Sequence, residues 1–266
     1  MKFDGVLFCT DIDSTLTEQE NKISKDNIDA IEYFVRNGGT FSVATGRTPL
    51  TIPEVLYQYI KVPVICQNGA VFDVHKKEYL YYKALDEKAI EIAKSISEQF
   101  PLSGIECFRL FDIAFAKHNK ATHRHIETEN ITCATHLDCG IDEVEGPILK
   151  ILFAQEEDET DTICEFYKNS KYQEEYQLVK SHAWYYEILR KDTNKGEALK
   201  KLCDLTDFEL KNVIVAGDND NDIELIKYAG LGYAVKNATQ NLKKAADKVT
   251  KRSNAQSAVA EIIYSI

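Results

Sequence analysis

The stretch Val6-Leu7-Phe8-Cys9-Thr10-Asp11-Ile12-Asp13-Ser14-Thr15-Leu16 decides the fold, because a short apolar run ends there in two carboxylates. A continuous apolar run such as residues 6–9 is typical of a parallel strand that is covered on both faces. Alternation along an extended chain places Asp11 and Asp13 on the same side, close enough for their charges to repel. An uncompensated pair beside an apolar strand is costly, so a cation or a shared proton is expected there.

Strand and helix patterns alternate after this stretch. Ser24 can cap a helix whose apolar residues recur at helical spacing until Gly38-Gly39. The expected strands, of which the last two form a hairpin, are residues 41–44, 62–66, 71–74 and 79–82. A second helix is expected between the first two of these strands, through Val55, Leu56, Tyr59 and Ile60.

The last quarter of the chain repeats this alternation. A helix is expected from Lys195, and the strands and helices that follow it are expected at residues 213–216, 223–226, 231–235 and 259–263. Strands that alternate with helices at both ends predict an α/β fold, a doubly wound, Rossmann-like parallel sheet with helices on both faces.

The middle of the chain has a different pattern. Helical stretches near residues 86–100, 119–130 and 157–172 alternate with strand-like stretches near residues 105–116, 147–154 and 176–190. We therefore predict an inserted α+β cap domain over residues 83–190. The Rossmann-like core then consists of residues 1–82 and 191–266.

The composition limits the possible partners and the location. The 266 residues include 32 Lys and Arg against 43 Asp and Glu, a net charge of −11, which gives no long-range attraction to nucleic acid or anionic membrane. No window reaches the roughly 18 apolar residues of a membrane span, and the first residues do not resemble a signal or transit peptide. The seven dispersed cysteines contain no C-x-x-C pair, so we expect reduced thiols in a cytoplasmic protein.

Four polar clusters lie at the ends of predicted strands or at the start of a helix, where ligands bind in open α/β sheets. They are Asp11–Leu16, Thr45-Gly46-Arg47, Lys195-Gly196 and Gly217-Asp218-Asn219-Asp220-Asn221-Asp222. Together they supply hard oxygen ligands for Mg²⁺, a nucleophilic carboxylate, and cationic or hydroxyl donors for an oxyanion. This set suits phosphoryl transfer, in which charge spread over three equatorial oxygens must be stabilised.

Each cluster taken alone has a simpler explanation. The first pair of acids could form a solvated turn, and Thr45-Gly46 could be an ordinary turn between a strand and a helix. Lys195 could lie on a wet helix face, and the acids of residues 218–222 could cap a helix. The occurrence of all four clusters in one chain favours a functional site over four separate coincidences.

The four clusters resemble the ordered motifs of the haloacid dehalogenase superfamily. Asp11–Leu16 is similar to its D-x-D-G-T-L signature, Thr45-Gly46-Arg47 to the second motif, Lys195 to the third, and residues 217–222 to the fourth, G-D-x-x-N-D. The insert between the second and third motifs, with Gln67-Asn68-Gly69-Ala70 before it, resembles the Cof-type subfamily of Mg²⁺-dependent sugar-phosphate phosphatases.

Two features depart from the family pattern. Ser14 stands where the family usually has glycine, which constrains the turn after the first aspartate. Residues 187–196 retain the family's Glu-Ile and Lys-Gly but lack the Pro and Gly that usually lie between them. Neither departure removes a chemical group from the site.

The resemblance implies a role for each residue. Asp11 is the nucleophile and Asp13 the general acid and base, while Asp11, Asp218 and the backbone carbonyl of Asp13 hold Mg²⁺. The residues implied in binding the phosphate or the substrate are Thr45, Gly46, Arg47, Lys195 and Asn221. Asp222 is implied in orienting Lys195 or the groups around the metal. The inserted domain is implied as a lid that excludes water.

Four histidines outside these motifs raise the question of a second metal site. The spacings of five and two residues among His118, His123 and His125 do not place three rings on one helical face. We therefore expect these residues and His136 to be solvent-facing histidines and not metal ligands.

The sequence therefore predicts a Mg²⁺-dependent phosphatase that acts on a small phosphorylated metabolite, with sugar phosphates favoured. One alternative keeps the fold but transfers phosphate between sugar positions, as a phosphotransferase or phosphomutase does. Another is a receiver that keeps the phosphoryl group on an aspartate as a switch, although receivers are single compact domains without such an insert. The physiological substrate and the oligomeric state, monomer or small homo-oligomer, stay open at this point.

Overall fold

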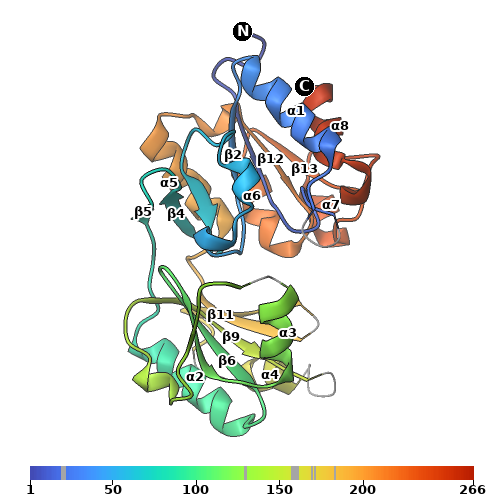
Figure 1. Ribbon diagram of the computed structural model, residues 1–266. Helices are drawn as coiled ribbons and strands as arrows, with labels where there is room; N and C mark the ends of the chain where they lie inside the picture. Colours follow the sequence, from blue (N-terminus) through green and yellow to red (C-terminus); the bar gives the residue numbers. More distant parts are fainter. Residues whose placement is uncertain (19–21, 129–130, 157–161, 169, 171, 183) are drawn as a thin grey trace. The chain divides into compact units, whose positions relative to one another are not determined.

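The chain folds into two compact units (Figure 1). The computed structural model describes residues 1–18, 22–128, 131–156, 162–168, 170, 172–182 and 184–266. The first unit comprises Met1–Arg47, Ile52–Tyr81 and Asn194–Ile266, and the second comprises Thr48–Thr51 and Tyr82–Thr193. The sequence predicts domain boundaries at 82/83 and 190/191. It also assigns residues 48–51 to the core, whereas in the structure these four residues group with the inserted unit.

The first unit is built on a five-stranded parallel sheet in the order β14-β13-β12-β1-β2. Its strands are β1 (Leu7–Thr10), β2 (Thr40–Val43), β12 (Val213–Gly217), β13 (Leu231–Ala234) and β14 (Lys248–Val249). Because β1 pairs with β2 on one side and with β12 on the other, the first and last quarters of the chain form one sheet. This arrangement confirms the predicted doubly wound α/β class.

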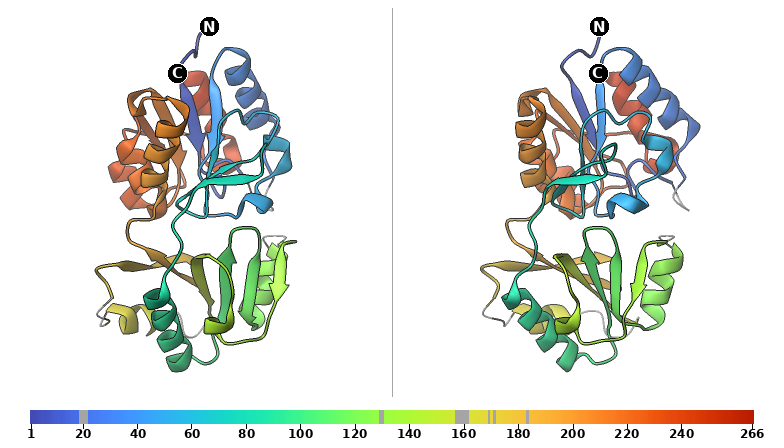
Figure 2. Two further views of the ribbon diagram at one scale, coloured as in Figure 1. Left: turned by 90° about the vertical axis from the view of Figure 1, so that its left-hand side faces the viewer. Right: turned by 60° about the vertical axis from the view of Figure 1, so that its left-hand side comes forward.

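Helices cover both faces of this sheet (Figure 2). On one face, α1 (Lys25–Arg36) packs against α8 (Ala258–Ser265), and the rings of Phe8 and Phe34 lie 6.0 Å apart. On the other face, Leu7 and Cys9 of β1 join a buried cluster with residues of α5 (Lys195–Thr206), α6 (Ile223–Tyr228) and α7 (Gln240–Ala245). All four residues of β1 are buried, which explains its uninterrupted apolar run.

The segment between β2 and the insert differs from the prediction. Residues 49–60 contain the two 3₁₀ turns Pro49–Thr51 and Glu54–Leu56 instead of the expected helix. Pro53 begins the second turn without a backbone N–H, and Ile60 pairs with Phe41 as an isolated parallel bridge, which removes Ile60 from any helix. The strands β3 (Val64–Cys66), β4 (Ala70–Asp73) and β5 (Glu78–Tyr81) then form a small antiparallel sheet.

The inserted unit contains a six-stranded sheet in the order β10-β11-β9-β6-β7-β8. Its elements are α2 (Glu87–Gln99), β6 (Gly104–Arg109), β7 (Ile113–Lys117), α3 (Lys120–Thr128), β8 (Ala134–His136), β9 (Ile148–Ala154), α4 (Thr162–Lys168), β10 (Tyr176–His182) and β11 (Tyr185–Arg190). The strand-like stretches at 105–116 and 176–190 each form an antiparallel pair, β6 with β7 and β10 with β11. Parts of the helices predicted at 119–130 and 157–172 lie outside the described residues.

Two predictions from composition can be compared with the structure. Among the described residues, none of the helices has both the length and the apolar character required to cross a lipid bilayer. No disulfide bond joins any of the seven cysteines.

Candidate active site

The acidic motifs meet where two neighbouring parallel strands end. Asp11 follows β1 directly and Asp218 follows β12 directly, and the last residue of β1, Thr10, lies opposite Ala216, the last but one of β12. The backbone N–H of Asp11 donates to the carbonyl of Ala216 at 2.9 Å, which extends the pairing by one residue. The two aspartates therefore leave the sheet at the same edge, the usual position of ligand sites in this class of fold.

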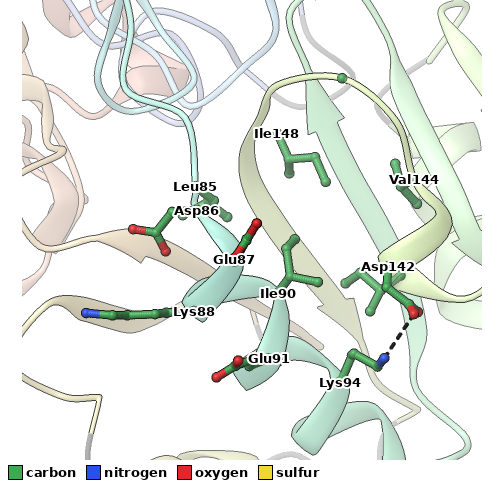
Figure 3. Close-up of a pocket in the computed structure, with 12 residues that line it drawn as sticks. Leu85, Asp86, Glu87, Lys88, Ile90, Glu91, Lys94, Asp142, Val144 and Ile148 are labelled. Carbon is green, nitrogen blue, oxygen red and sulfur yellow. Dashed lines mark hydrogen bonds and ion pairs between the residues drawn. The ribbon is translucent and has the colours of Figure 1, made fainter.

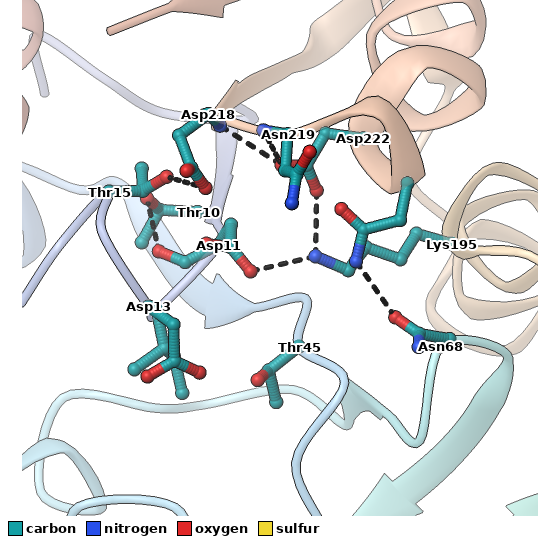
Figure 4. A network of polar contacts seen from close by, with 12 residues as sticks. Thr10, Asp11, Asp13, Thr15, Thr45, Asn68, Lys195, Asp218, Asn219 and Asp222 are labelled. Atoms are coloured by element: carbon teal, nitrogen blue, oxygen red, sulfur yellow. Dashed lines mark hydrogen bonds and ion pairs between the residues drawn. The ribbon is translucent and has the colours of Figure 1, made fainter. Parts of the chain in front are cut away.

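Lys195 bridges two of the carboxylates (Figure 4). It is the first residue of α5, and its Nζ lies 2.7 Å from Asp11 Oδ1 and 2.7 Å from Asp222 Oδ1. Lys195 is only 1% exposed. Burial alone would lower the pKa of Lys195, but the adjacent Asp11 and Asp222 carboxylates raise it above its usual value, so the side chain stays cationic.

Asp222 has a different environment from the other acids. Its Oδ2 accepts hydrogen bonds from the backbone N–H groups of Asp218 at 3.0 Å and Asn219 at 3.3 Å, while its Oδ1 accepts from Lys195. A Cβ atom on Gly217 would clash with this carboxylate, so the turn requires glycine there. Both oxygens of Asp222 are engaged in holding the turn and Lys195 in place.

The site has more negative than positive charge. One carboxylate oxygen from each of Asp11, Asp218 and Asp222 lies within 4.8 Å of the other two, and Lys195 is the cation that bonds to this group. Burial and the neighbouring Asp222 raise the pKa of Asp218 to about 7, and burial also raises the pKa of Asp11. Hard oxygen donors at such spacing fit a divalent cation such as Mg²⁺, which would offset the repulsion.

Asp13 does not join this group, because it is paired with Arg47. The guanidinium Nη2 lies 2.6 Å from Asp13 Oδ1, and Nε lies 3.0 Å from Oδ2, so the contact is bidentate. The Arg47 side chain is 6% exposed and that of Asp13 is 46% exposed. Arg47 therefore contacts the second aspartate, although the sequence suggests that it contacts phosphate or substrate.

Thr45 and Gly46 lie beside a residue that the motif analysis does not assign to the site. The Thr45 hydroxyl accepts from the backbone N–H of Arg47 at 3.1 Å, and the Thr45 carbonyl accepts from the N–H of Asn68 at 3.1 Å. Asn68 adopts a left-handed backbone with φ of +60°, and its Oδ1 accepts from Asn221 Nδ2 at 3.1 Å. A Cβ atom on Gly46 would lie 3.2 Å from the Asn68 amide. Asn68 thus connects the second and fourth motifs.

Two further residues of the first motif have defined positions. Thr15 is fully buried, and its hydroxyl donates to Asp218 Oδ1 at 3.2 Å, a contact that the sequence analysis does not identify. Ser14 adopts a φ of +58°, and its carbonyl accepts from Asn237 Nδ2 at 2.8 Å. The only sequence signal for Asn68 is its place in Gln67-Asn68-Gly69-Ala70, and for Thr15 its place in the first motif.

A groove of about 870 Å³ on the inserted unit is a less suitable site (Figure 3). Four acidic side chains line it, and Lys94 donates across it to Asp142 at 2.9 Å. Its second lysine, Lys88, is paired with Glu175. An anionic ligand would meet excess negative charge there, so its size does not make this groove the better candidate.

Comparison with known proteins finds a matching family, similar sequences and similar solved structures. A family model described as haloacid dehalogenase-like hydrolase matches residues 8–263. Two Bacillus subtilis proteins named 5-amino-6-(5-phospho-D-ribitylamino)uracil phosphatase are similar: YitU is 24% identical over 97% of this chain and 96% of its own, and YwtE is 26% identical over 95% of each. The solved structure of a HAD subclass IIB sugar phosphatase, BT4131, is 18% identical, covers 98% of both chains and superposes with a TM-score of 0.83.

Proposed function

Because the chain belongs to the haloacid dehalogenase-like hydrolases, we propose that it is a Mg²⁺-dependent phosphatase that hydrolyses small phosphomonoesters, sugar phosphates among them. The observation that carries this proposal is the environment of Asp11. Its Oδ1 is bonded to Lys195, whereas its Oδ2 accepts no hydrogen bond from any described residue. A buried carboxylate with one oxygen held and the other available is suited to nucleophilic attack.

The acidic group is the proposed cation site. Asp11 and Asp218 would hold Mg²⁺ through their carboxylates and Asp13 through its backbone carbonyl. When bound, the ion supplies positive charge that stabilises the phosphoryl oxygens. Asp222 is not a proposed ligand, because its oxygens are already bonded to Lys195 and to the backbone of residues 218 and 219.

In the first half of the proposed reaction, Asp11 Oδ2 attacks the phosphorus atom. The bond between phosphorus and the substrate oxygen breaks as the bond to Asp11 forms, which gives an aspartyl phosphate. Lys195 and Thr45 bind the phosphoryl oxygens and stabilise their charge. Asp13 donates a proton to the departing oxygen, which an alkoxide needs because it is a poor leaving group.

In the second half, Asp13 accepts a proton from the water that attacks the aspartyl phosphate. This attack releases inorganic phosphate and restores Asp11. Arg47 is proposed as a positioning residue for Asp13, since its bidentate contact fixes the direction in which the partly exposed carboxylate points.

The inserted unit is proposed to supply substrate specificity. The two B. subtilis relatives are named for a phosphorylated ribitylamino compound, and BT4131 is described as a sugar phosphatase. We extend from these names only the chemical class, a small metabolite that carries a phosphate ester on a sugar or sugar alcohol.

The direct test measures the release of inorganic phosphate from a panel of phosphorylated metabolites, with Mg²⁺ and with EDTA. We expect Asp11→Asn to remove turnover while Asp204→Asn, an exposed acid on α5, retains it. EDTA should remove activity reversibly. Full activity of Asp11→Asn or of the metal-free protein would refute the proposal.

Analysis of the products and of the lifetime of the phosphorylated protein separates the alternative functions. A phosphomutase would move the phosphate within the sugar without releasing it, which product analysis detects. A receiver would keep the phosphoryl group on Asp11 far longer than the seconds or less expected of a phosphatase intermediate.

A further inference from the structure

The turn between β3 and β4 contacts two motifs of the proposed active site. Its residues Gln67 and Asn68 adopt left-handed backbones, with φ of +47° and +60°. The N–H of Gln67 donates to the carbonyl of Arg47 at 2.8 Å. The N–H of Asn68 donates to the carbonyl of Thr45 at 3.1 Å, while Asn68 Oδ1 accepts from Asn221 Nδ2 at 3.1 Å (Figure 4). Asn68 therefore contacts the second motif through its backbone and the fourth motif through its side chain.

Asn221 is anchored differently from the acids that surround it in the fourth motif. Three aspartates of this motif accept hydrogen bonds from other segments of the first unit: Asp218 from Thr15, Asp220 from Thr239 and Asn241, and Asp222 from Lys195. Within the part of the chain that the structure describes, Asn68 is the partner of the Asn221 side chain. Loss of this bond would leave the Asn221 amide free to turn about its side-chain bonds.

The glycine of the second motif makes room for Asn68. The three atoms nearest to a Cβ atom built on Gly46 all belong to the Asn68 side chain, with Nδ2 and Oδ1 at 3.2 Å and Cγ at 3.5 Å. Any larger residue at position 46 would therefore press on this amide. Asparagine also tolerates a left-handed backbone better than most residues other than glycine. Both residues are thus suited to the contact between Asn68 and Asn221.

We propose that Asn68 is a positioning residue for Asn221, a role that rests on the phosphatase function proposed above. The Asn221 amide has two N–H groups, and Asn68 accepts from one of them. The other N–H can then donate to a phosphoryl oxygen. A donor that is oriented before the substrate arrives stabilises phosphoryl charge without the cost of ordering it during the reaction. Because the backbone of Asn68 is bonded to Thr45, the same residue also sets the spacing between Thr45 and Asn221.

Asn68→Gly tests the side chain alone, because glycine keeps the left-handed backbone and the N–H that bonds to Thr45. We expect kcat/KM for a phosphomonoester to fall by at least about tenfold. Calorimetry in the presence of Mg²⁺ should show a weaker affinity for inorganic phosphate. Asn221→Ala should have a comparable effect, and the double variant should lose no more than the more impaired single variant, because the two residues act as a unit.

Gly46→Ala provides an independent test. It should impair a protein that contains Asn68, since the new Cβ atom presses on the Asn68 amide. In the Asn68→Gly background the same substitution should cost little more, because the atoms that it would meet are absent. Lys77→Gly is the matched control. Lys77 is exposed and has a φ of +57° in the turn between β4 and β5, so this variant should retain kcat/KM and phosphate affinity.

The outcomes separate the role of Asn68 from the proposed function. Wild-type kcat/KM and phosphate affinity in Asn68→Gly would overturn the positioning role, and so would additive losses in the double variant with Asn221→Ala. If the wild type hydrolyses no phosphomonoester, the proposed function fails, and phosphate affinity alone then tests Asn68. Weaker phosphate binding by Asn68→Gly would still support the positioning role, whereas equal binding, or none by either protein, would overturn it.

Discussion

The Arg47 guanidinium is buried while the carboxylate that it contacts is nearly half exposed. A buried cation with such a partner is strongly constrained, since leaving it unpaired would cost several kcal/mol. The direction of the Asp13 side chain is therefore set by a residue of another motif. A role of Arg47 in orienting Asp13 can be distinguished by experiment from a role in binding phosphate.

We predict that Arg47→Met reduces kcat/KM for an alkyl phosphate far more than for p-nitrophenyl phosphate, whose leaving group needs little protonation. Arg47→Lys should restore part of the loss. In a double variant with Asp13→Asn, the Arg47 change should add little, because residues that act as a unit are not additive. Independent, additive losses on both substrates would contradict the positioning role.

Ser14 occupies a left-handed conformation with φ of +58°, which disfavours side chains that branch at Cβ. Ser14→Val should therefore lower the free energy of unfolding by about 1–2 kcal/mol. Ser14→Gly should change it by less than about 1 kcal/mol, because relief of strain and the greater freedom of the unfolded chain oppose each other. Urea denaturation followed by circular dichroism measures both values. A Val variant as stable as the Gly variant would count against the described turn.

At the scale of single elements, α2 begins with an aspartate that has several partners. Asp86 Oδ1 accepts from the backbone N–H of Ala89 and from the hydroxyl of Tyr176, and Arg190 lies 3.4 Å from Oδ2. The Tyr176 hydroxyl contributes most to a pKa of Asp86 below its usual value, and the Ala89 N–H and Arg190 act in the same direction. The ionised form of Asp86 therefore stabilises the inserted unit.

This environment predicts a pH dependence. A lowered folded-state pKa gives stability that is present above the unfolded value of about 3.9 and is lost as the pH falls through the folded value. Asparagine caps helices about as well as aspartate, so the Asp86→Asn substitution tests the contribution of the charge alone. The wild type should be more stable than Asp86→Asn near pH 7, and the difference should shrink below about pH 4. A difference that grows on acidification would contradict this assignment.

Elements with strong local patterns could be predicted from the sequence, and those set by distant contacts could not. The apolar run 6–9 and the helix after Ser24 appear as β1 and α1, since burial on both faces and a capping residue are encoded locally. The helix expected through Val55–Ile60 is absent because Ile60 pairs with Phe41, a contact between separate segments. The pairing of β6 with β7 likewise depends on a reversal of chain direction between Arg109 and Ile113, where the sequence contains no Gly or Pro to indicate a turn.

The same division applies to the candidate site. Asp11, Lys195, Asp218 and Asp222 could be grouped from the sequence because each follows or precedes a recognisable element. The contact of Arg47 with Asp13 and that of Asn68 with Asn221 could not, because each depends on side-chain directions in loops. Of the predicted solvent-facing histidines, His123 and His136 are exposed, whereas His125 is only 12% exposed because its Nδ1 lies 2.7 Å from the buried Glu106 Oε2.

At the scale of the whole molecule, the two units allow cation binding to be localised. The acidic group lies in the first unit, whereas the single tryptophan, Trp184, lies in the inserted unit. A ligand that binds only the folded state raises the free energy of unfolding, by about 2.7 kcal/mol at one hundred times its dissociation constant. Trp184 fluorescence therefore reports on the unit that does not hold the acidic group.

We predict that Mg²⁺ raises the thermal unfolding midpoint followed by circular dichroism, and that the transition followed by Trp184 fluorescence moves less. EDTA should reverse the change. Asp218→Asn should remove it, whereas Asp204→Asn should not. An undiminished Mg²⁺ effect in Asp218→Asn would exclude that residue as a ligand.

The pairing of β1 with β12, in which Leu7 lies opposite Val213, affects the order in which parts of the protein can fold during synthesis. During translation, β1 leaves the ribosome on the order of tens of seconds before β12 is synthesised. Throughout that interval the edge of β1 that β12 will occupy is open, and by its end all residues of the inserted unit have been added to the nascent chain. The inserted unit can therefore fold first, whereas the strand that ends at the proposed nucleophile stays unpaired on that side until the last quarter of the chain arrives.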